Sequence, residues 1–219
     1  MAQILPPPQT LARGPWELDQ VEAHWHEREY VPSEEVTAEA DAAIADLRGR
    51  GSPSHDGWAA RLIDHRLHDG RLVLELQPVR WALRLVVGDM QASVAALCVV
   101  RDAQGRWLAG RRAAWLSTWA GRWALGAGGA VDRGESPADT LLREVSEEWS
   151  VTPERARAEA LLWLPQNMYM LVGQAWLPEG AEVVPDHEHD EYAWWAPEVE
   201  EWPEQADEYL RRMARFLSG

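Results

Sequence analysis

The spacing of apolar residues predicts a helix and two strands in the first part of the chain. Ser33 can cap a helix that ends near Gly49 and carries apolar residues at helical spacing. After a turn signal at Asp69-Gly70, Leu72–Leu76 and Val79–Val86 alternate or run apolar as strands do. These two strands are expected to form a small sheet or the contact of a homodimer.

The pattern becomes denser from Ala92 onward. Ser93–Arg101 predicts a strand, Asp102–Gly105 a turn, and Arg106–Arg111 the hairpin partner of that strand. Later elements are predicted as strands at Leu161–Leu164, Met168–Trp176 and Tyr192–Trp195, an acidic loop at Pro178–Glu191, and a closing helix over Pro203–Leu217 with Ala206, Leu210, Met213, Ala214 and Leu217 buried. Because strands and helices mix without strict alternation, the predicted class is α/β in the broad sense, of the α+β type.

The length of 219 residues exceeds one typical domain without reaching two. We therefore predict an N-terminal extension or small subdomain over residues 1–90, of unknown role, and a main domain over 91–219. The first 30 or so residues, with Pro6-Pro7-Pro8, are interpreted as an arm or extended segment.

Charge restricts the partners. A net charge of -15 argues against binding to a nucleic-acid backbone, which needs a basic surface. An anionic substrate would need a bridging metal ion. The chain contains no lysine, which excludes Schiff-base chemistry and a Walker A site and leaves arginine to meet any phosphate.

Cysteine and tryptophan usage adds two expectations. The single Cys98 lies in an apolar run, which favours a core residue over a nucleophile and fits a reducing compartment. With no signal peptide and no apolar stretch long enough to span a membrane, we expect a cytoplasmic location and no membrane partner. The 14 tryptophans lack fixed spacing, so we interpret them as packing residues, a few of which line the ligand pocket.

A helix with an unusual set of carboxylates is predicted after Gly129. Ser136 can cap it, Pro137 suits its first position, and Asp139 resembles the acidic member of a capping box. The apolar stripe expected to pack on the sheet is Ala138, Leu141, Leu142, Val145 and Trp149. At helical geometry, three carboxylates converge beside that stripe: Glu144, Glu147 and Glu148.

Clustered carboxylates repel one another unless a cation lies among them. Hard oxygen ligands at this spacing suit Mg²⁺ or Mn²⁺. The alternative is a solvated acidic helix face, which is common for glutamate-rich helices. The residues on either side of the triplet favour the metal site.

Those residues form a longer pattern that resembles the Nudix box of the Nudix hydrolase family: Gly, five residues, Glu, seven residues, Arg-Glu, an aliphatic residue, any residue, then Glu-Glu. The matching positions are Gly129, Glu135, Arg143, Glu144, Val145, Glu147, Glu148 and the aliphatic Val151. The resemblance covers roughly Ala92 to Gly219. It implies an α/β/α sandwich with a mixed sheet and metal-dependent hydrolysis of a phosphoanhydride bond in a nucleoside diphosphate linked to another group.

Motif position also implies roles. Glu144, Glu147 and Glu148 would hold the metal ions, with the Gly128 carbonyl as a further ligand, and Glu147 and Glu148 would serve catalysis. Glu135 and Arg143 would pair to brace the helix and the loop before it. Metal ions in such a site neutralise phosphate charge, activate water and stabilise the leaving oxygen.

Two departures from the family pattern concern the backbone. Ser150 replaces the closing glycine, which commonly adopts the left-handed conformation that ends a helix, at a cost of roughly 1 kcal/mol for other residues. Before the box, Gly126-Ala127-Gly128-Gly129 stands where many members have a proline ahead of paired glycines, so a more flexible loop is expected.

Further candidates lie outside the box. Arg111, Arg112 and Arg122 are predicted to contact substrate phosphates, with a surface salt bridge as the equal alternative for each. In the acidic loop, Glu188 or Glu191 could act as general base, against a solvated loop. His187 and His189 lack a third ligand at zinc-like spacing, so a structural zinc is not expected.

Two other functions on the same fold remain open at this point. The first is a non-catalytic nucleotide-binding or regulatory module, suggested by Ser150 and by the unexplained N-terminal region. The second is an isomerase of the kind that acts on isopentenyl diphosphate, which needs an active-site cysteine that Cys98 is poorly placed to supply. Nucleoside triphosphate, nucleotide sugar, dinucleotide and coenzyme A cannot be separated as substrates from the sequence.

Overall fold

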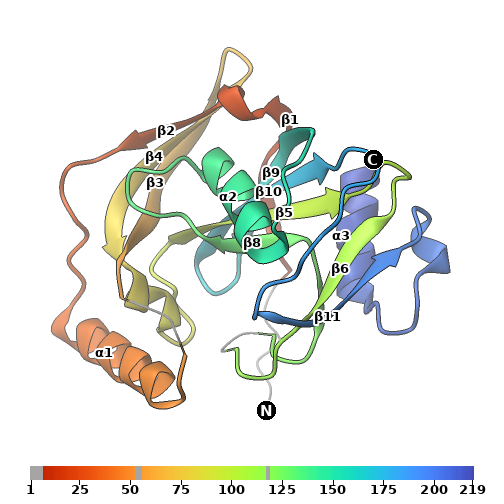
Figure 1. Ribbon diagram of the computed structural model, residues 1–219. Helices are drawn as coiled ribbons and strands as arrows, with labels where there is room; N and C mark the ends of the chain where they lie inside the picture. The colour runs from red at the N-terminus through yellow and green to blue at the C-terminus, as the bar shows by residue number, and fades with distance from the viewer. Residues whose placement is uncertain (1–6, 53–55, 117–118) are drawn as a thin grey trace.

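The structure is a computed structural model that describes residues 7–52, 56–116 and 119–219. Pro6 of the predicted arm lies outside these residues. The strands of the protein form one mixed sheet in which β1, β9, β10, β5, β3, β4 and β2 lie side by side (Figure 1). Of the remaining strands, β6 and β8 pair with β5, and β7 and β11 pair with β6. The strands are β1 Gln9–Glu17, β2 Val21–Trp25, β3 Trp58–His68, β4 Arg71–Arg80, β5 Ser93–Arg101, β6 Trp107–Arg112, β7 Trp123–Leu125, β8 Ala127–Ala130, β9 Arg155–Leu164, β10 Met168–Trp176 and β11 His189–Trp195.

Helices α2 (Pro137–Trp149) and α3 (Glu208–Ser218) cover opposite faces of the sheet at its centre. The side chains of β5 alternate between them: Val94, Ala96, Cys98 and Val100 join α2 in one core, and Val99 joins α3 in another. The predicted α+β sandwich is therefore confirmed, and β5 and β10 have the predicted bounds.

The predicted hairpin between β5 and β6 is wrong in its pairing. The two strands meet only at Arg101 and Trp107, and β6 instead pairs with β11 and β7. Along most of its length β5 is bonded to β10 in parallel and to β8 in antiparallel fashion. Because both edges of β5 are thus occupied, the chain must diverge after the turn.

The predicted strand Val79–Val86 is also wrong, because β4 ends at Arg80 and Trp81–Leu85 forms a short 3-10 helix, η2. The apolar residues of this segment are buried against α1 (Glu34–Gly49), whose cap at Ser33 was predicted. The apolar run therefore indicated burial correctly, while its period did not distinguish a strand from a tight helix.

Residues 9–17 and 21–25 are strands of the sheet, joined by the short 3-10 helix η1 (Leu18–Gln20), and do not form the predicted arm. β1 pairs antiparallel with β9, and β2 pairs parallel with β4. Trp16 and Val21 enter the same core as α2. Pairing between segments about 150 residues apart leaves no local pattern in the sequence, which explains why the arm was the natural interpretation.

Strands from both sides of residue 90 share this sheet, and β5 meets β3 at Arg61 and Ser93. The division into residues 1–90 and 91–219 stays a prediction. Over Leu72–Leu76 both edges of β4 are taken, by β3 and β2, so this part of the strand offers no edge to a second chain. The homodimer stays a prediction as well.

Three boundaries differ clearly from prediction. β11 begins at His189, inside the predicted acidic loop and three residues before the predicted strand. β9 begins at Arg155, six residues before the predicted strand, and α3 begins after its cap at Asp207 instead of at Pro203. On α3 Leu210, Ala214 and Leu217 are buried as predicted; Ala206 is buried ahead of the helix, and Met213 is half-buried. Within the described residues, no helix combines the length and apolar character needed to cross a membrane. The cytoplasmic location stays a prediction.

Candidate active site

Helix α2 begins as its sequence predicts. The Ser136 hydroxyl accepts a hydrogen bond from the Ala138 amide at 3.2 Å, and Pro137 is the first helical residue. The predicted apolar stripe is buried except for Leu142, which is 36% exposed. The burial of this stripe turns the neighbouring face, which carries Glu144 and Glu148, toward the glycine-rich strand β8.

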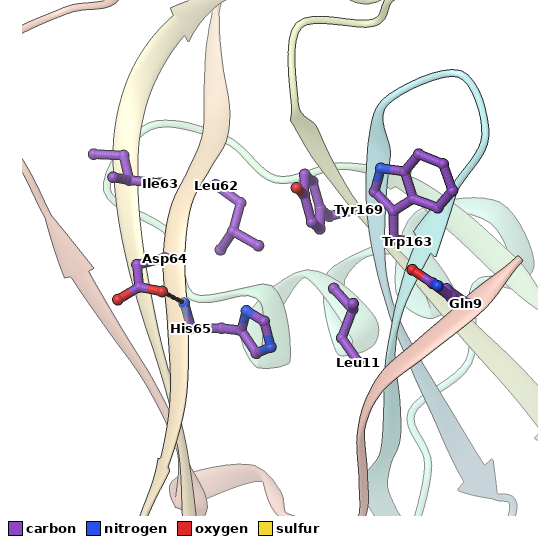
Figure 2. A pocket seen from close by; sticks show the side chains of 8 residues that line it. All are labelled: Gln9, Leu11, Leu62, Ile63, Asp64, His65, Trp163 and Tyr169. Atoms are coloured by element: carbon purple, nitrogen blue, oxygen red, sulfur yellow. Dashed lines mark hydrogen bonds between the residues drawn. The ribbon is translucent and has the colours of Figure 1, made fainter.

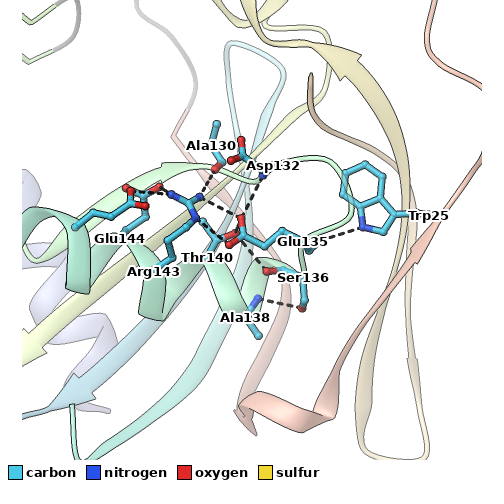
Figure 3. Close-up of polar contacts among 10 residues, drawn as sticks. Trp25, Ala130, Asp132, Glu135, Ser136, Ala138, Thr140, Arg143 and Glu144 are labelled. Atoms are coloured by element: carbon cyan, nitrogen blue, oxygen red, sulfur yellow. Dashed lines mark hydrogen bonds and ion pairs between the residues drawn. The ribbon is translucent and has the colours of Figure 1, made fainter. Parts of the chain in front are cut away.

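Arg143 organises the polar side of α2 (Figure 3). Its guanidinium donates to both oxygens of Glu135, at 2.9 and 3.1 Å, and to the Ala130 carbonyl at 3.0 Å. Glu135 Oε2 also accepts a hydrogen bond from the Thr140 hydroxyl at 2.7 Å. This network joins the helix to the strand and loop that precede it, as motif position implied for the Glu135–Arg143 pair.

The N-terminal strands hold the same loop from the other side. The Trp25 indole donates to the Glu135 carbonyl at 3.0 Å, and Arg133 pairs with Glu29 at 2.9 Å. The Ala60 amide donates to the Val131 carbonyl at 2.8 Å. The loop of the box is thus held by residues far before it in the chain. The glycine run Gly126–Gly129, which was expected to form a flexible loop, instead lies mostly in strand β8, which pairs with β5.

Two carboxylates of the box are buried against β8. Glu144 is 8% exposed and Glu148 is 4% exposed. The Gly128 amide donates to Glu148 Oε1 at 3.0 Å, and a Cβ on Gly129 would lie 2.2 Å from Glu144 Oε1. Only glycine at 129 therefore leaves room for the Glu144 carboxylate in its present position.

Burial makes these carboxylates easy to protonate when no metal is bound. It raises the pKa of Glu144 to about 7, against the opposing effect of Arg143. Burial likewise raises the pKa of Glu148 well above its usual value, and the hydrogen bond from Gly128 only partly opposes this. Glu188 also has a raised pKa, again mainly from burial. A bound cation would reverse this cost by favouring the charged forms.

The acidic loop before β11 docks on the last turn of α2. The Asp186 amide donates to the Glu148 carbonyl at 2.9 Å, and the Asp186 carboxylate lies 3.2 Å from His189 Nδ1. The other ring nitrogen of His189 lies 3.7 Å from Glu148 Oε2. Glu188 faces Arg112 at 3.6 Å, whereas Glu191 pairs with Arg111 at 3.2 Å. Of the two predicted bases, Glu188 is the one near Glu144 and Glu148.

The three box glutamates do not converge in this structure. Arg143 Nη1 donates to Glu144 Oε1 at 2.7 Å and to Glu147 Oε2 at 3.0 Å, and the Glu147 side chain is 58% exposed. Within the described residues, no group of three or more His, Cys, Asp or Glu side chains is arranged to hold a metal ion. The carboxylate donors, and the burial that raises the pKa values of Glu144 and Glu148, fit a hard cation at these two residues. Glu147 would have to leave Arg143 to join them.

A cleft of about 440 Å³ opens beside Glu148 and the glycines of β8. Of the predicted arginines, Arg112 lines it. Arg111 pairs with Glu191, and Arg122 pairs with Asp207 at 2.5 Å, and neither lines the cleft. The lining also includes many apolar side chains, several of them methionines: Met90, Trp119, Leu164, Met168, Met170 and Met213. Trp119 is the tryptophan that lines the cleft.

Sequence reasoning missed Arg84 and gave His189 only a weak role as a metal ligand. Both line the cleft. Arg84 comes from η2, inside the apolar run that predicted a strand, so its only sequence signal was an arginine within a buried segment. The position of His189 depends on how the acidic loop docks, and no local pattern encodes that.

Cys98 lies on β5 next to Ala127 of β8, and it is buried and does not line the cleft. Burial raises the pKa of its thiol to about 12, so it stays protonated at neutral pH. A cysteine-dependent isomerase therefore finds no support in this site.

A second cavity, of about 380 Å³, lies away from the box between β3 and strands β1, β9 and β10 (Figure 2). Its lining is mixed, with Ile63, Asp64 and His65 on one side and Trp163 and Tyr169 on the other. It contains no residue of the Nudix-like pattern, so the chemistry of the box belongs to the first cleft.

The two backbone departures have clear structural outcomes. Ser150 ends α2 in the left-handed conformation, with φ of 52° and ψ of 36°, where glycine was expected. Gly126 also has positive φ, 66°, and a Cβ there would lie 1.9 Å from the Cys98 carbonyl oxygen. Glycine is therefore required at position 126, because the backbone of Cys98 approaches it too closely for a side chain. Ser150, in contrast, adopts a conformation that is strained for a residue other than glycine.

The chain matches the family model described as the NUDIX domain over residues 92–216. Among solved structures it is similar to a MutT protein from Methanosarcina mazei Go1, with 27% identity over 57% of this chain and 93% of that chain and a TM-score of 0.45. It is similar to an Ap4A hydrolase from C. elegans in a binary complex, with 25% identity over 57% and 98% and a TM-score of 0.44.

A third similar structure is the NUDIX domain of Shewanella oneidensis NrtR complexed with ADP ribose, with 18% identity over 58% of this chain and 88% of that chain and a TM-score of 0.42. The search of curated proteins gave no significant match. The family model, in contrast, covers more than half of the chain and includes every position of the Nudix-like pattern. On that match the chain belongs to the Nudix family of hydrolases.

Proposed function

We propose that the chain hydrolyses a phosphoanhydride bond in a nucleoside diphosphate linked to another group, such as a nucleoside triphosphate, a nucleotide sugar or a dinucleotide. One observation carries the proposal: Glu144 and Glu148 are buried side by side against Gly128 and Gly129 in a Nudix box that borders a cleft. Buried carboxylates without a matching cation are costly, and a divalent ion offsets that cost.

Mg²⁺ or Mn²⁺ is the proposed cofactor, because both prefer carboxylate and carbonyl oxygens. Glu144 and Glu148 would hold it, with the Gly128 carbonyl and, once it has left Arg143, Glu147 as further ligands. When bound, the ion would polarise the phosphoryl group of the substrate and lower the pKa of a water molecule bound to it.

The remaining residues have separate tasks in this proposal. Glu188 accepts the proton of the attacking water, since its raised pKa makes it a better base than an ordinary carboxylate. Arg112 binds a substrate phosphate from the same cleft. Glu135 and Arg143 keep α2 and the preceding loop in place. Arg111 and Arg122, which are paired elsewhere, contribute less than Arg112.

The deciding experiment measures nucleotide and phosphate release from a panel of nucleoside triphosphates, nucleotide sugars and dinucleotides, with Mg²⁺ or Mn²⁺. Wild type is compared with Glu148→Gln and with Glu154→Gln, an exposed carboxylate outside the site. We expect chelator-sensitive turnover that falls about 100-fold or more in Glu148→Gln and is unchanged in Glu154→Gln.

Silence of the wild type across the panel, together with Glu148-dependent Mn²⁺ binding in calorimetry, would replace hydrolysis by the non-catalytic nucleotide-binding module. Equal turnover in wild type and Glu148→Gln would remove the box from the reaction altogether.

A further inference from the structure

The cleft receives residues from outside the segment that matches the Nudix family model. Arg84 and Met90 precede residue 92, where that match begins, and both line the cleft. Arg84 lies on η2, which packs against α1 through Ala82 and Leu83. The N-terminal part of the chain therefore places a cation at a site whose catalytic residues come from α2.

Arg84 is partly buried, yet within the part of the chain that the structure describes it forms no ion pair with a carboxylate. The Arg84 guanidinium lies over the Trp81 ring, with its carbon 5.5 Å from the ring centroid. The other arginines that border the site have partners: Arg112 faces Glu188, and Arg143 holds Glu135. A half-buried guanidinium without a counterion is costly unless a ligand supplies one.

The charged groups that act on Arg84 belong to the same site. Burial lowers the pKa of Arg84, the charge of Glu144 opposes this effect, and the charge of Arg112 adds to it. Arg84 and Arg112 are therefore close enough to repel each other, and both line the cleft. An anion between two guanidinium groups converts that repulsion into two charge-assisted contacts.

The geometry points to Arg84 as a substrate-binding residue that, together with Arg112, holds a phosphate group of the substrate in the cleft. This inference rests on the proposed function, since it assigns one phosphate contact of the same site. It also gives residues 1–90 a role, because η2 carries the second cation. A diphosphate attached to a flat apolar group fits the cleft, since methionines and Trp119 line it together with the two arginines.

An alternative role for Arg84 would be to balance the charge of Glu144 from a distance. The two roles differ in what they affect. A substrate contact controls the affinity for phosphate and leaves the affinity for the metal alone unchanged. A charge-balancing residue controls the affinity for the metal. This difference supplies a readout that a merely structural role would not give.

The test uses the full chain, imidodiphosphate with saturating Mg²⁺ as a non-hydrolysable probe that needs no base recognition, and Mn²⁺ alone as the second probe. Binding is measured by calorimetry for wild type, Arg84→Gln, Arg84→Lys and the control Arg48→Gln, an exposed arginine on α1. Arg84→Met, which keeps an unbranched chain beside Trp81, replaces Arg84→Gln if the latter does not fold.

We expect Arg84→Gln to weaken imidodiphosphate binding at least tenfold, Arg84→Lys to recover part of that loss, and Arg48→Gln to remain within twofold of wild type. Mn²⁺ affinity should be unchanged in all of them. The inference is overturned if Arg84→Gln binds imidodiphosphate within twofold of wild type, if wild type does not bind it, or if the Mn²⁺ affinity alone changes.

These outcomes separate the two proposals. Arg84-dependent binding in a protein that hydrolyses nothing would reject the hydrolase reaction and keep the phosphate contact. Metal-dependent turnover with the same KM in wild type and Arg84→Gln would keep the hydrolase reaction and reject the phosphate contact of Arg84.

Discussion

The serine at the end of α2 offers a sharp test of how local backbone strain affects this site. Ser150 has φ of 52° and ψ of 36°, and its amide donates to the Ser146 carbonyl at 3.0 Å. Ser146 and Ser150 are both exposed and lie one turn apart, but Ser146 is in the helix interior. The same substitution, serine to glycine, should therefore have opposite effects at the two positions.

The magnitudes follow from backbone energetics. The left-handed conformation costs an L-residue roughly 1–2 kcal/mol, and glycine avoids that cost. Glycine also makes the unfolded chain more flexible, which costs about 0.4–1 kcal/mol. Ser150→Gly should thus raise the free energy of unfolding by about 0.5–1 kcal/mol. Ser146→Gly should lower it by about 0.5 kcal/mol, since glycine is the poorer helix former.

Urea denaturation followed by tryptophan fluorescence, with a chelator present, would measure both changes. Thermal midpoints should move by about 2–4 °C per kcal/mol in a chain of this size. Turnover should stay close to wild type in Ser150→Gly, because the carboxylates of Glu144 and Glu148 are held from the sheet side by β8. Equal destabilisation by the two glycines would refute the reasoning, since the conformation of Ser150 would then carry no strain.

Three further predictions concern the same region. Burial raises the pKa of Glu144 in the folded protein from 4.5 to about 7, so the stability gained from its protonation is lost as pH rises through 7. Glu144→Gln should therefore raise the free energy of unfolding of the metal-free protein by up to about 3 kcal/mol at pH 8 and leave it unchanged near pH 4.5. Urea denaturation at both pH values measures this difference. Gly126→Ala should destabilise by about 3 kcal/mol or prevent folding, as measured by circular dichroism, because its Cβ would meet the Cys98 carbonyl; a wild-type melt would contradict this. Trp25→Phe removes one hydrogen bond to Glu135 and should cost about 1 kcal/mol in urea denaturation; a cost of zero would show that this hydrogen bond does not brace the loop.

Local sequence determined the helix that carries the chemistry. Caps, helical period and the spacing of Glu144, Glu147 and Glu148 depend on residues within one or two turns, so the bounds and buried stripe of α2 could be predicted except at Leu142. The apolar runs of β5 and β10 were equally readable, because strands buried on both faces leave continuous apolar sequence.

Only the tertiary structure decided which residues meet at the site. The burial that raises the pKa values of Glu144 and Glu148 comes from strand β8 and the acidic loop, which pack from other parts of the chain. The three predicted arginines looked alike in sequence, and their distribution between the cleft and surface carboxylates depends on how β6, β11 and α3 pack. Pairing and docking between distant segments carry no local period, and for that reason the place of β1 and β2 in the sheet and of Arg84 in the cleft could not be predicted from sequence.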